Sequence, residues 1–290
     1  VIAGICIMEE NGRIENFYVT RSSRMGSEFL TNELVDEMSA EVVARTAKLF
    51  SASRPKTGEM EVVMGAGQSG ILLHEAMGHA FEADFNRKNQ SIFSDRMGKK
   101  IAEDFVTIVD DGTIPGNRGS LNFDDEGIPT EKTILVKDGT LTSYLHDRIS
   151  AGYYKVKPTG NGRRQSFRHI PMPRMRSTYM ENGPHRKEEI IASVKSGIYV
   201  DYFSNGEVNI GQGDFTFFVK FGYMIENGKL TTPIKDINVI GNGPQALADI
   251  VMVADDMAID NGGGTCGKNG QSAPVTMGMP TVKIRKLTVG

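Results

Sequence analysis

Two histidines flank a glutamate in the segment HEAMGH at residues 74–79, in a chain of 290 residues with only five histidines. Neutral imidazoles are good zinc ligands, and a carboxylate beside the metal can take a proton from a bound water. The pattern is typical of a zinc hydrolase, with His74 and His79 as ligands and Glu75 as the base. The alternative is two partly buried histidines on an ordinary helix, which the intervening glutamate makes less favourable.

The spacing of the two histidines does not suit a regular helix. At 3.6 residues per turn, side chains five positions apart point roughly 140° away from each other, whereas a spacing of four leaves about 40°. A π-type bulge brings positions i and i+5 nearly into line, and such bulges tend to occur at functional sites. We therefore predict a bulge or break of the helix near Gly78, where glycine makes a distortion easier.

A catalytic zinc ion needs a third protein ligand and an open fourth position. The candidate is Cys266, which lies in the glycine-rich segment NGGGTCGK at residues 261–268. The glycines allow a close approach of the backbone, and Lys268 would favour the thiolate. The alternative is a small buried hydrophobic residue, as we interpret Cys6 in its apolar strand. The residues alone leave both interpretations of Cys266 open.

Two other glycine-rich segments resemble phosphate-binding motifs. The segment GAGQSG at residues 65–70 has the dinucleotide fingerprint and lies between a predicted strand and a predicted helix, but that helix carries His74. Residues 262–268 have the spacing of a phosphate loop, but Asn269 stands where that motif has Ser or Thr. We predict no nucleotide cofactor from either segment.

Residues 155–176 are strongly basic and contain no acid. We interpret this stretch as a loop that pairs with carboxylates or with the C-terminus of a substrate. A contact with nucleic acid is the alternative, but a formal net charge of −3 argues against it. The basic residues of the stretch are Lys155, Lys157, Arg163, Arg164, Arg168, Arg174 and Arg176.

Turn signals and periodicity predict an α+β fold with a largely antiparallel sheet and an early metal-binding helix. Asn11-Gly12 predicts a hairpin, apolar spacing predicts a helix over residues 32–49, and residues 188–196 predict a short helix ended by Gly197. Asp110-Asp111-Gly112 predicts a turn between short apolar runs. We place a boundary near residue 58, with 1–58 as the tail of a truncated α/β region and 59–290 as the catalytic domain. With two cysteines and no apolar run long enough to span a membrane, we expect a cytoplasmic protein.

Three separated blocks resemble the TldD/PmbA family of metallopeptidases. They are the segment GILLHEAMGH at residues 70–79 with its continuation to residue 88, the segments GNGRR and RHIPMPRM at residues 160–164 and 168–175, and the segment GTCGKNGQSAPV at residues 264–275. The resemblance implies a peptidase of the HExxxH-containing, active kind, acting on unfolded or partially degraded peptides. It also implies one zinc ion per active subunit, with His74, His79 and Cys266 as ligands and Glu75 as base and later acid.

Members of that family form dimers, either with themselves or with a related subunit that lacks the motif. The resemblance therefore implies a homodimer or a heterodimer, with extended peptides as substrates and no membrane or direct nucleic-acid partner. The rival hypothesis is a non-catalytic regulatory subunit that binds peptides, or gyrase-related partners, without hydrolysing them. Stoichiometric zinc together with chelator-sensitive cleavage would separate the two hypotheses.

Overall fold

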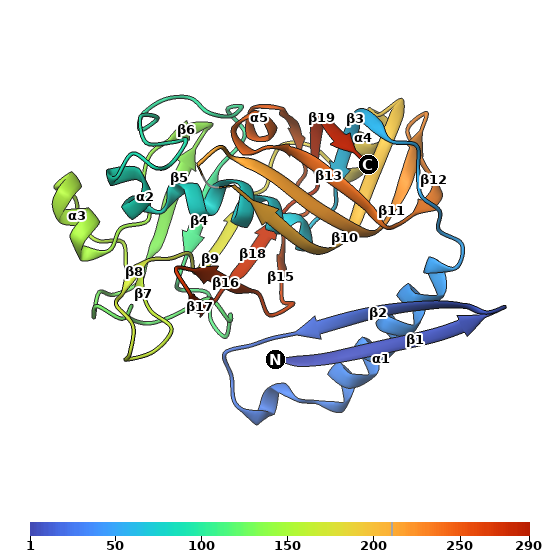
Figure 1. The fold of residues 1–290 in the computed structure, drawn as a ribbon, viewed down its shortest axis with the longest axis horizontal. Coiled ribbons are helices and arrows are strands. Elements are labelled where there is room, and N and C mark those ends of the chain that lie inside the picture. The colour runs from blue at the N-terminus through green and yellow to red at the C-terminus, as the bar shows by residue number, and fades with distance from the viewer. Residues whose placement is uncertain (210) are drawn as a thin grey trace.

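The structure, a computed structural model, describes residues 1–209 and 211–290. The chain opens with a hairpin of β1 (Ile2–Glu10) and β2 (Arg13–Arg21), which packs on the helix α1 (Asn32–Leu49), as Figure 1 shows. The turn residues Asn11 and Gly12 have φ angles of 53° and 77°, as a type I′ turn requires. The predicted hairpin and the predicted helix are both confirmed.

A closed barrel forms one of the two main parts of the remaining molecule. The strand β10 (Ser196–Val208) pairs with β3 (Gly58–Met64), β3 with β19 (Val282–Val289), β19 with β13 (Ile237–Asn242), and β13 with β11 (Asp214–Glu226). The strand β11 returns to β10 and closes the ring. Two further strands extend it, β12 (Lys229–Ile234) beside β11 and β14 (Ile250–Val253) beside β19. Of these pairs only β10–β3 is parallel.

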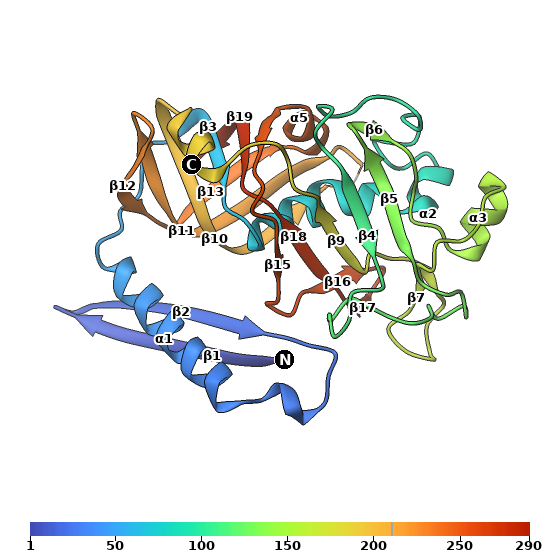
Figure 2. The same ribbon diagram turned by 180° about the vertical axis from the view of Figure 1, so that it is seen from behind.

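A second sheet lies beside the barrel (Figure 2). Its order is β15 (Ala258–Asp260), β18 (Thr276–Met279), β9 (Ser177–Met180), β4 (Ile108–Asp111), β5 (Lys132–Lys137) and β6 (Thr140–Leu141). Two small hairpins accompany it, β7 (Gly162–Arg163) with β8 (Met172–Pro173), and β16 (Thr265–Lys268) with β17 (Gln271–Pro274). The fold is α+β and mostly antiparallel, as the sequence predicts.

Short helical turns between residues 68 and 87 run between the barrel and the second sheet (Figure 1). Their apolar side chains, such as Leu73 and Met77, share one buried cluster with Phe217 of the barrel and Ile108 of the second sheet. Burial of apolar area on both sides fixes this segment in place. The regular helices are short: α2 (Ala83–Arg87), α3 (Arg148–Tyr154), α4 (Lys187–Ala192) and α5 (Gly243–Ala248).

Two local predictions were wrong. The helix α4 ends at Ala192, and Gly197 lies inside β10, because the residues from Ser196 onward pair with β3 and β11. Asp110 and Asp111, expected in a turn, form the end of β4. Aspartate is disfavoured in strands, but Asp110 is fully buried there because it pairs with the guanidinium of Arg176.

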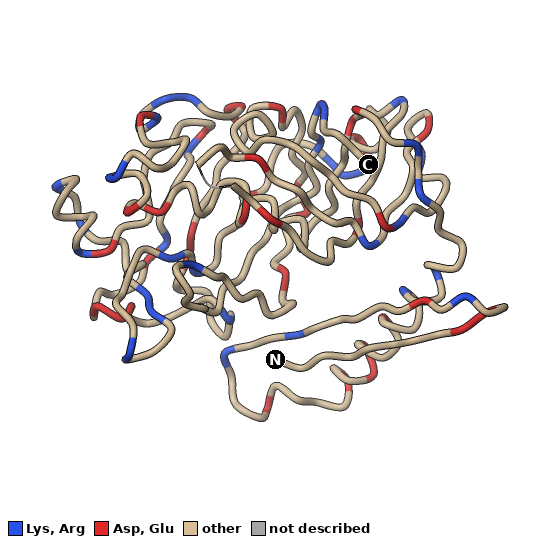
Figure 3. Tube along the Cα trace, in the orientation of Figure 1, with Lys and Arg blue, Asp and Glu red and all other residues tan. Residues whose placement is uncertain are grey.

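Basic and acidic residues are interspersed along the chain (Figure 3). This mixture agrees with the small formal net charge of −3. Within the described ranges, no helix is long and apolar enough to cross a membrane.

Candidate metal centre

A π-helical turn brings the two histidines of the motif together. Residues Leu73–Gly78 form this turn, and the backbone N–H of His79 donates to the carbonyl of His74, five positions back. The two imidazole rings stand edge to face, with centroids 5.2 Å apart. The bulge predicted from the spacing is therefore confirmed, because a wider turn aligns positions i and i+5.

Gly78 serves a different purpose from the one its sequence position suggests. Its φ and ψ of −59° and −49° are those of an ordinary right-handed helix, so it relieves no backbone strain. A Cβ atom at this position would instead lie 2.1 Å from Sδ of Met175. A larger residue here would have to displace the side chain of Met175, because the segment before β9 packs directly on the π turn.

Cys266 comes from the hairpin β16–β17 and meets the two histidines. One side-chain atom from each of His74, His79 and Cys266 lies within 4.8 Å of the others, and all three residues are buried. Sγ of Cys266 is 3.3 Å from Nε2 of His79. The structure thus brings together the three residues that the sequence nominated as ligands, from positions almost 190 residues apart.

The donor set and its dimensions fit a tetrahedral zinc ion. With Zn–N of about 2.0–2.1 Å and Zn–S of about 2.3 Å, ligand atoms at tetrahedral angles lie roughly 3.3–3.6 Å apart. Nδ1 of His74 is also buried without a hydrogen-bond partner among the described residues. A buried polar atom in that state costs about 1–3 kcal/mol. The site is therefore compatible with an ion in composition and in spacing.

Glu82 orients His79 through Nδ1, the ring nitrogen that does not face Cys266. Nδ1 of His79 lies 3.1 Å from Oε2 of Glu82, so the ring can donate there while Nε2 faces Cys266. Glu82 also lies 3.0 Å from Nζ of Lys268, and Lys268 lies 2.7 Å from Oδ1 of Asp84. This buried group of four side chains is called the lysine cluster below. Such a carboxylate–histidine pair fixes the tautomer of a metal ligand.

The charges of the cluster shift the pKa values of its members. Burial by itself raises the pKa of the Cys266 thiol, but the neighbouring His74 and His79 bring it down to about 5. Burial opposes protonation of His79, yet Glu82 and the Cys266 thiolate raise its pKa well above the usual value. The metal-free site thus favours a thiolate, which is the form that binds zinc.

Lys268 does not act on Cys266 in the way expected from the sequence. Its ammonium group is occupied by Glu82 and Asp84, and it also donates to the carbonyl of Pro173 at 3.0 Å. The histidines, not the lysine, lower the pKa of the thiol. Lys268 instead joins the hairpin β16–β17 to the helical segment that carries His79.

Hydrogen bonds hold the glycine-rich segment from Asn261 to Cys266 at both of its ends. Its carbonyl at Asn261 accepts a hydrogen bond of 2.7 Å from the backbone of Ser22, which follows β2. The backbone carbonyl of Cys266 itself accepts one of 2.6 Å from Nη2 of Arg174. These contacts position the ligand cysteine, and residues far apart in sequence supply them.

Glu75 lies on the same π turn and is only partly buried, unlike both flanking residues. It is not one of the three clustered donors. A partly exposed carboxylate on the residue next to a metal ligand can accept a proton from a water at the site. Its role as a base is taken up below as a proposal.

The remaining glycine motif has a packing role. A Cβ at Gly70 would lie 2.6 Å from the backbone nitrogen of Gly278 in β18. The third glycine of the dinucleotide-like pattern is needed because a strand crosses there. The geometry gives the pattern a reason that involves no nucleotide.

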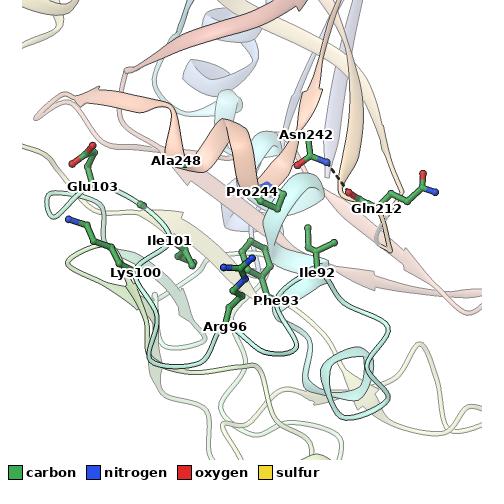
Figure 4. A pocket seen from close by; sticks show the side chains of 11 residues that line it. Ile92, Phe93, Arg96, Lys100, Ile101, Glu103, Gln212, Asn242, Pro244 and Ala248 are labelled. Carbon is green, nitrogen blue, oxygen red and sulfur yellow. Dashed lines mark hydrogen bonds between the residues drawn. The ribbon is translucent and has the colours of Figure 1, made fainter.

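A cavity of about 630 Å³ lies elsewhere, beside α5 (Figure 4). Ile92, Phe93 and Pro244 contribute apolar surface to it, while Arg96 and Lys100 contribute charge. None of the three clustered donors lines this cavity. The cavity and the candidate metal centre are therefore separate features.

The sequence pattern does not identify Glu82, Asp84 and Arg174 as residues of the site. One signal was available, because Glu82 follows His79 by three residues, a spacing at which helical side chains meet. Nothing local to Arg174 indicates that it binds the carbonyl of Cys266, 92 residues away. The residues that support the metal ligands meet through tertiary contacts, which residue spacing in the sequence does not predict.

Comparison with known proteins shows which family the chain resembles. Residues 57–290 match the model of the PmbA/TldA metallopeptidase C-terminal domain. The chain is 44% identical to the metalloprotease TldD homolog of Buchnera aphidicola over 98% of this chain and 60% of that protein. It is 34% identical to the zinc metalloprotease TldD homolog of Saccharolobus solfataricus over 88% of this chain and 57% of that one.

A solved structure shows the same fold. The crystal structure of a Thermotoga maritima protein, described as a candidate modulator of a DNA gyrase, superposes with a TM-score of 0.80 at 23% identity. The match covers 99% of this chain and 61% of that one. The chain thus spans about 60% of the length of the first relatives that it matches.

Proposed function

This chain belongs to the PmbA/TldA metallopeptidase family, and from that premise we propose that it hydrolyses peptide bonds with the help of one zinc ion. The observation that carries the proposal is the convergence of His74, His79 and Cys266 on one small buried site. A π turn, which is rare, is needed to achieve it. Three protein ligands leave a fourth position open, as in catalytic zinc sites, whereas structural zinc sites have four protein ligands.

The proposed ligands are His74, His79 and Cys266, which leave one position for water or substrate. When bound, zinc supplies Lewis-acid chemistry, lowering the pKa of a water to about 7 and polarising a carbonyl. Glu75 takes the proton from the attacking water and later gives it to the departing amine. Glu82 keeps His79 in the required tautomer through Nδ1.

We further propose that the substrates are extended, unfolded or partially degraded peptides in the cytoplasm. A peptide that pairs through its backbone would be read with little regard for its side chains. The family premise also supports a dimer, either of this chain's protein or with a related subunit without the motif. These points concern the whole protein, and the matched relative is longer than this chain, which covers 60% of it.

The test compares the wild-type protein with Glu75→Gln and Cys266→Ala, using an unfolded polypeptide as substrate. We expect the Glu75 variant to keep one zinc ion per chain but to lose hydrolysis by about 10²–10⁴-fold, the usual contribution of a general base. We expect the Cys266 variant to lose both zinc and hydrolysis. The exposed Glu59→Gln serves as the matched control and should leave both unchanged.

Two results would contradict the proposal. One is full peptidase activity in the zinc-loaded Glu75→Gln protein. The other is a wild-type protein that binds peptides with stoichiometric zinc but does not cleave them, which would support the regulatory subunit instead.

A further inference from the structure

Three arginines of the basic stretch are buried together around a single carboxylate. The exposed fractions are 0% for Arg174, Arg176 and Asp110 and 3% for Arg163. This group is called the arginine cluster below. Because moving a charge out of water costs several kcal/mol, each buried guanidinium needs a partner.

Arg176 takes the only carboxylate that forms an ion pair within this cluster. Its Nε lies 2.8 Å from Oδ2 of Asp110, and its Nη2 donates to the carbonyl of the same residue at 3.0 Å. Asp110 also accepts from Asn161 and Thr178. The acceptor capacity of this aspartate is used within the framework of the second sheet.

Arg174 is occupied by the hairpin that carries Cys266. Its Nη2 donates to the carbonyl of Cys266 at 2.6 Å, and its Nη1 reaches the carbonyl of Gln271 at 3.4 Å. Its remaining nitrogen, Nε, is sealed from solvent. Arg174 is therefore a positioning residue for the cysteine.

Arg163 differs from both. It donates from Nη1 to the carbonyl of Met175, and among residues 1–209 and 211–290 it makes no other side-chain hydrogen bond and no ion pair. The sealed, partnerless arginine nitrogens of the described chain are Nε of Arg87 and Nε of Arg174. Nε and Nη2 of Arg163 therefore keep access to solvent space, although the side chain is almost fully buried.

Arg163 is anchored next to the metal centre. Met175, whose carbonyl accepts from its Nη1, is the residue packed against Gly78, next to His79. Burial lowers the pKa of Arg163 to about 10, while Asp110 and, more weakly, the Cys266 thiolate act to raise it. At neutral pH the side chain stays charged, so a buried cation lies close to the segment that carries the clustered ligands.

The charges of the arginine cluster do not balance. Three guanidinium groups face one carboxylate, and even the Cys266 thiolate leaves one positive charge in excess. Uncompensated buried charge of this kind is characteristic of sites that receive an oppositely charged group. The group that arrives at a peptidase centre is the carbonyl of the scissile bond, which becomes negative during the reaction.

We propose that Arg163 binds the scissile carbonyl oxygen through Nε or Nη2 and stabilises the negative charge that this oxygen acquires. This inference rests on the proposed function. The water oxygen forms a bond to the carbonyl carbon, the π electron pair moves onto the carbonyl oxygen, and Glu75 accepts the proton. Arg163 transfers no proton. The C–O double bond then re-forms as the C–N bond breaks and the amine leaves with the proton from Glu75.

The experiment measures kcat, KM and zinc content for wild type, Arg163→Met and Arg163→Lys in the full chain. The neighbour Arg164→Met is the matched control, because Arg164 is more exposed and lies near Asp125. We expect Arg163→Met to lower kcat by about 10²–10³-fold, as removal of an oxyanion donor does. KM should change less than about threefold and zinc content not at all, with Arg163→Lys intermediate and Arg164→Met like wild type.

A second readout does not depend on turnover. A phosphinic peptide, which mimics the tetrahedral anion, should bind wild type more tightly than Arg163→Lys and Arg163→Met, in proportion to their kcat/KM values. If Arg163→Met does not fold, the comparison of Arg163→Lys with wild type, in kcat and in phosphinate affinity, still tests the inference.

Two outcomes would overturn the inference. The first is a zinc-loaded Arg163→Met protein with a kcat within threefold of wild type. The second is an effect on KM alone that disappears when the peptide C-terminus is amidated, since Arg163 would then bind a terminal carboxylate. A zinc-loaded wild type that cleaves nothing would contradict the proposed function itself, and so is distinguishable from both.

Discussion

The lysine cluster and the arginine cluster both contact Cys266 but differ in how their charges are matched. In the lysine cluster, Lys268 touches both Glu82 and Asp84, and Glu82 also touches His79. In the arginine cluster, only Arg176 has a carboxylate, while Arg163 has a single carbonyl. Both are buried, so the difference is one of charge and not of environment.

This difference in charge pairing separates the residues that hold the metal ligands in place, called the framework below, from the residue that meets the substrate. A buried network whose charges are paired holds its members in one arrangement, and in the lysine cluster this holds although Oε1 of Glu82 has no hydrogen-bond partner among the described residues. A network with unmatched donors is less favourable alone and becomes matched when an anion arrives. We infer that the lysine cluster fixes the metal ligands and that Arg163 meets the substrate.

The largest expected effect comes from breaking the matched cluster. Replacing Lys268 by Met leaves the carboxylates of Glu82 and Asp84 buried without their cation. Breaking a buried pair in this way costs about 3–5 kcal/mol. We expect the free energy of unfolding, measured by urea titration of the metal-free protein, to fall by that amount.

The control for this change is Lys286→Met, which removes a lysine whose pair with Glu59 is exposed on both sides. Exposed pairs contribute about 0–1 kcal/mol. A loss for Lys268→Met as small as that for the control would show that the lysine cluster is not part of the framework.

A somewhat smaller effect is expected from acid. Burial alone would raise the pKa of Glu82, but Lys268 and His79 lower it to about 2, from an ordinary value of 4.5. A carboxyl whose pKa is depressed on folding stabilises the protein above its unfolded pKa, and this contribution disappears as the pH falls through the folded pKa. The metal-free protein should therefore lose on the order of 3 kcal/mol between pH 4.5 and pH 2 from this group.

Urea titrations at several pH values check this expectation, with Glu82→Gln as the comparison. The variant should be less stable at neutral pH and should show a shallower loss toward acid. Parallel pH profiles for the two proteins would mean that the carboxyl of Glu82 is not held ionised by its neighbours.

The smallest expected effect on stability comes from Arg163→Met. An uncompensated buried cation contributes little to folding, and an apolar side chain of similar length can replace it at no net loss. We expect the free energy of unfolding to change by less than about 1 kcal/mol, in contrast to Lys268→Met. A loss of about 3 kcal/mol or more would place Arg163 in the framework and remove the distinction between the two clusters.

The sequence predicted the ligands because their chemistry is local. The spacing of His74 and His79 excluded a regular helix, and the π turn follows from that geometry. The scarcity of histidine and the glycines around Cys266 narrowed the choice of donors. The hairpin at Asn11-Gly12 was predictable for the same reason, since two residues with positive φ determine its turn.

The residues that support the metal ligands could not be predicted, because their positions depend on contacts between residues far apart in the sequence. Arg174 reaches Cys266 only after the second sheet and the hairpin β16–β17 have formed. Asp110 reads as a turn residue until Arg176 is placed beside it. The basic stretch was interpreted as pairing with carboxylates or with a substrate. Arg176 does pair with a carboxylate, and our proposal for Arg163 assigns it to the substrate.

The central claim is that His74, His79 and Cys266 together bind one zinc ion. X-ray absorption spectroscopy of the zinc-loaded protein tests it most directly, because sulfur and nitrogen ligands give separate distances. We predict one sulfur at about 2.3 Å with nitrogen or oxygen ligands at about 2.0–2.1 Å, and loss of the sulfur in Cys266→Ala. A wild-type spectrum without sulfur would contradict the account.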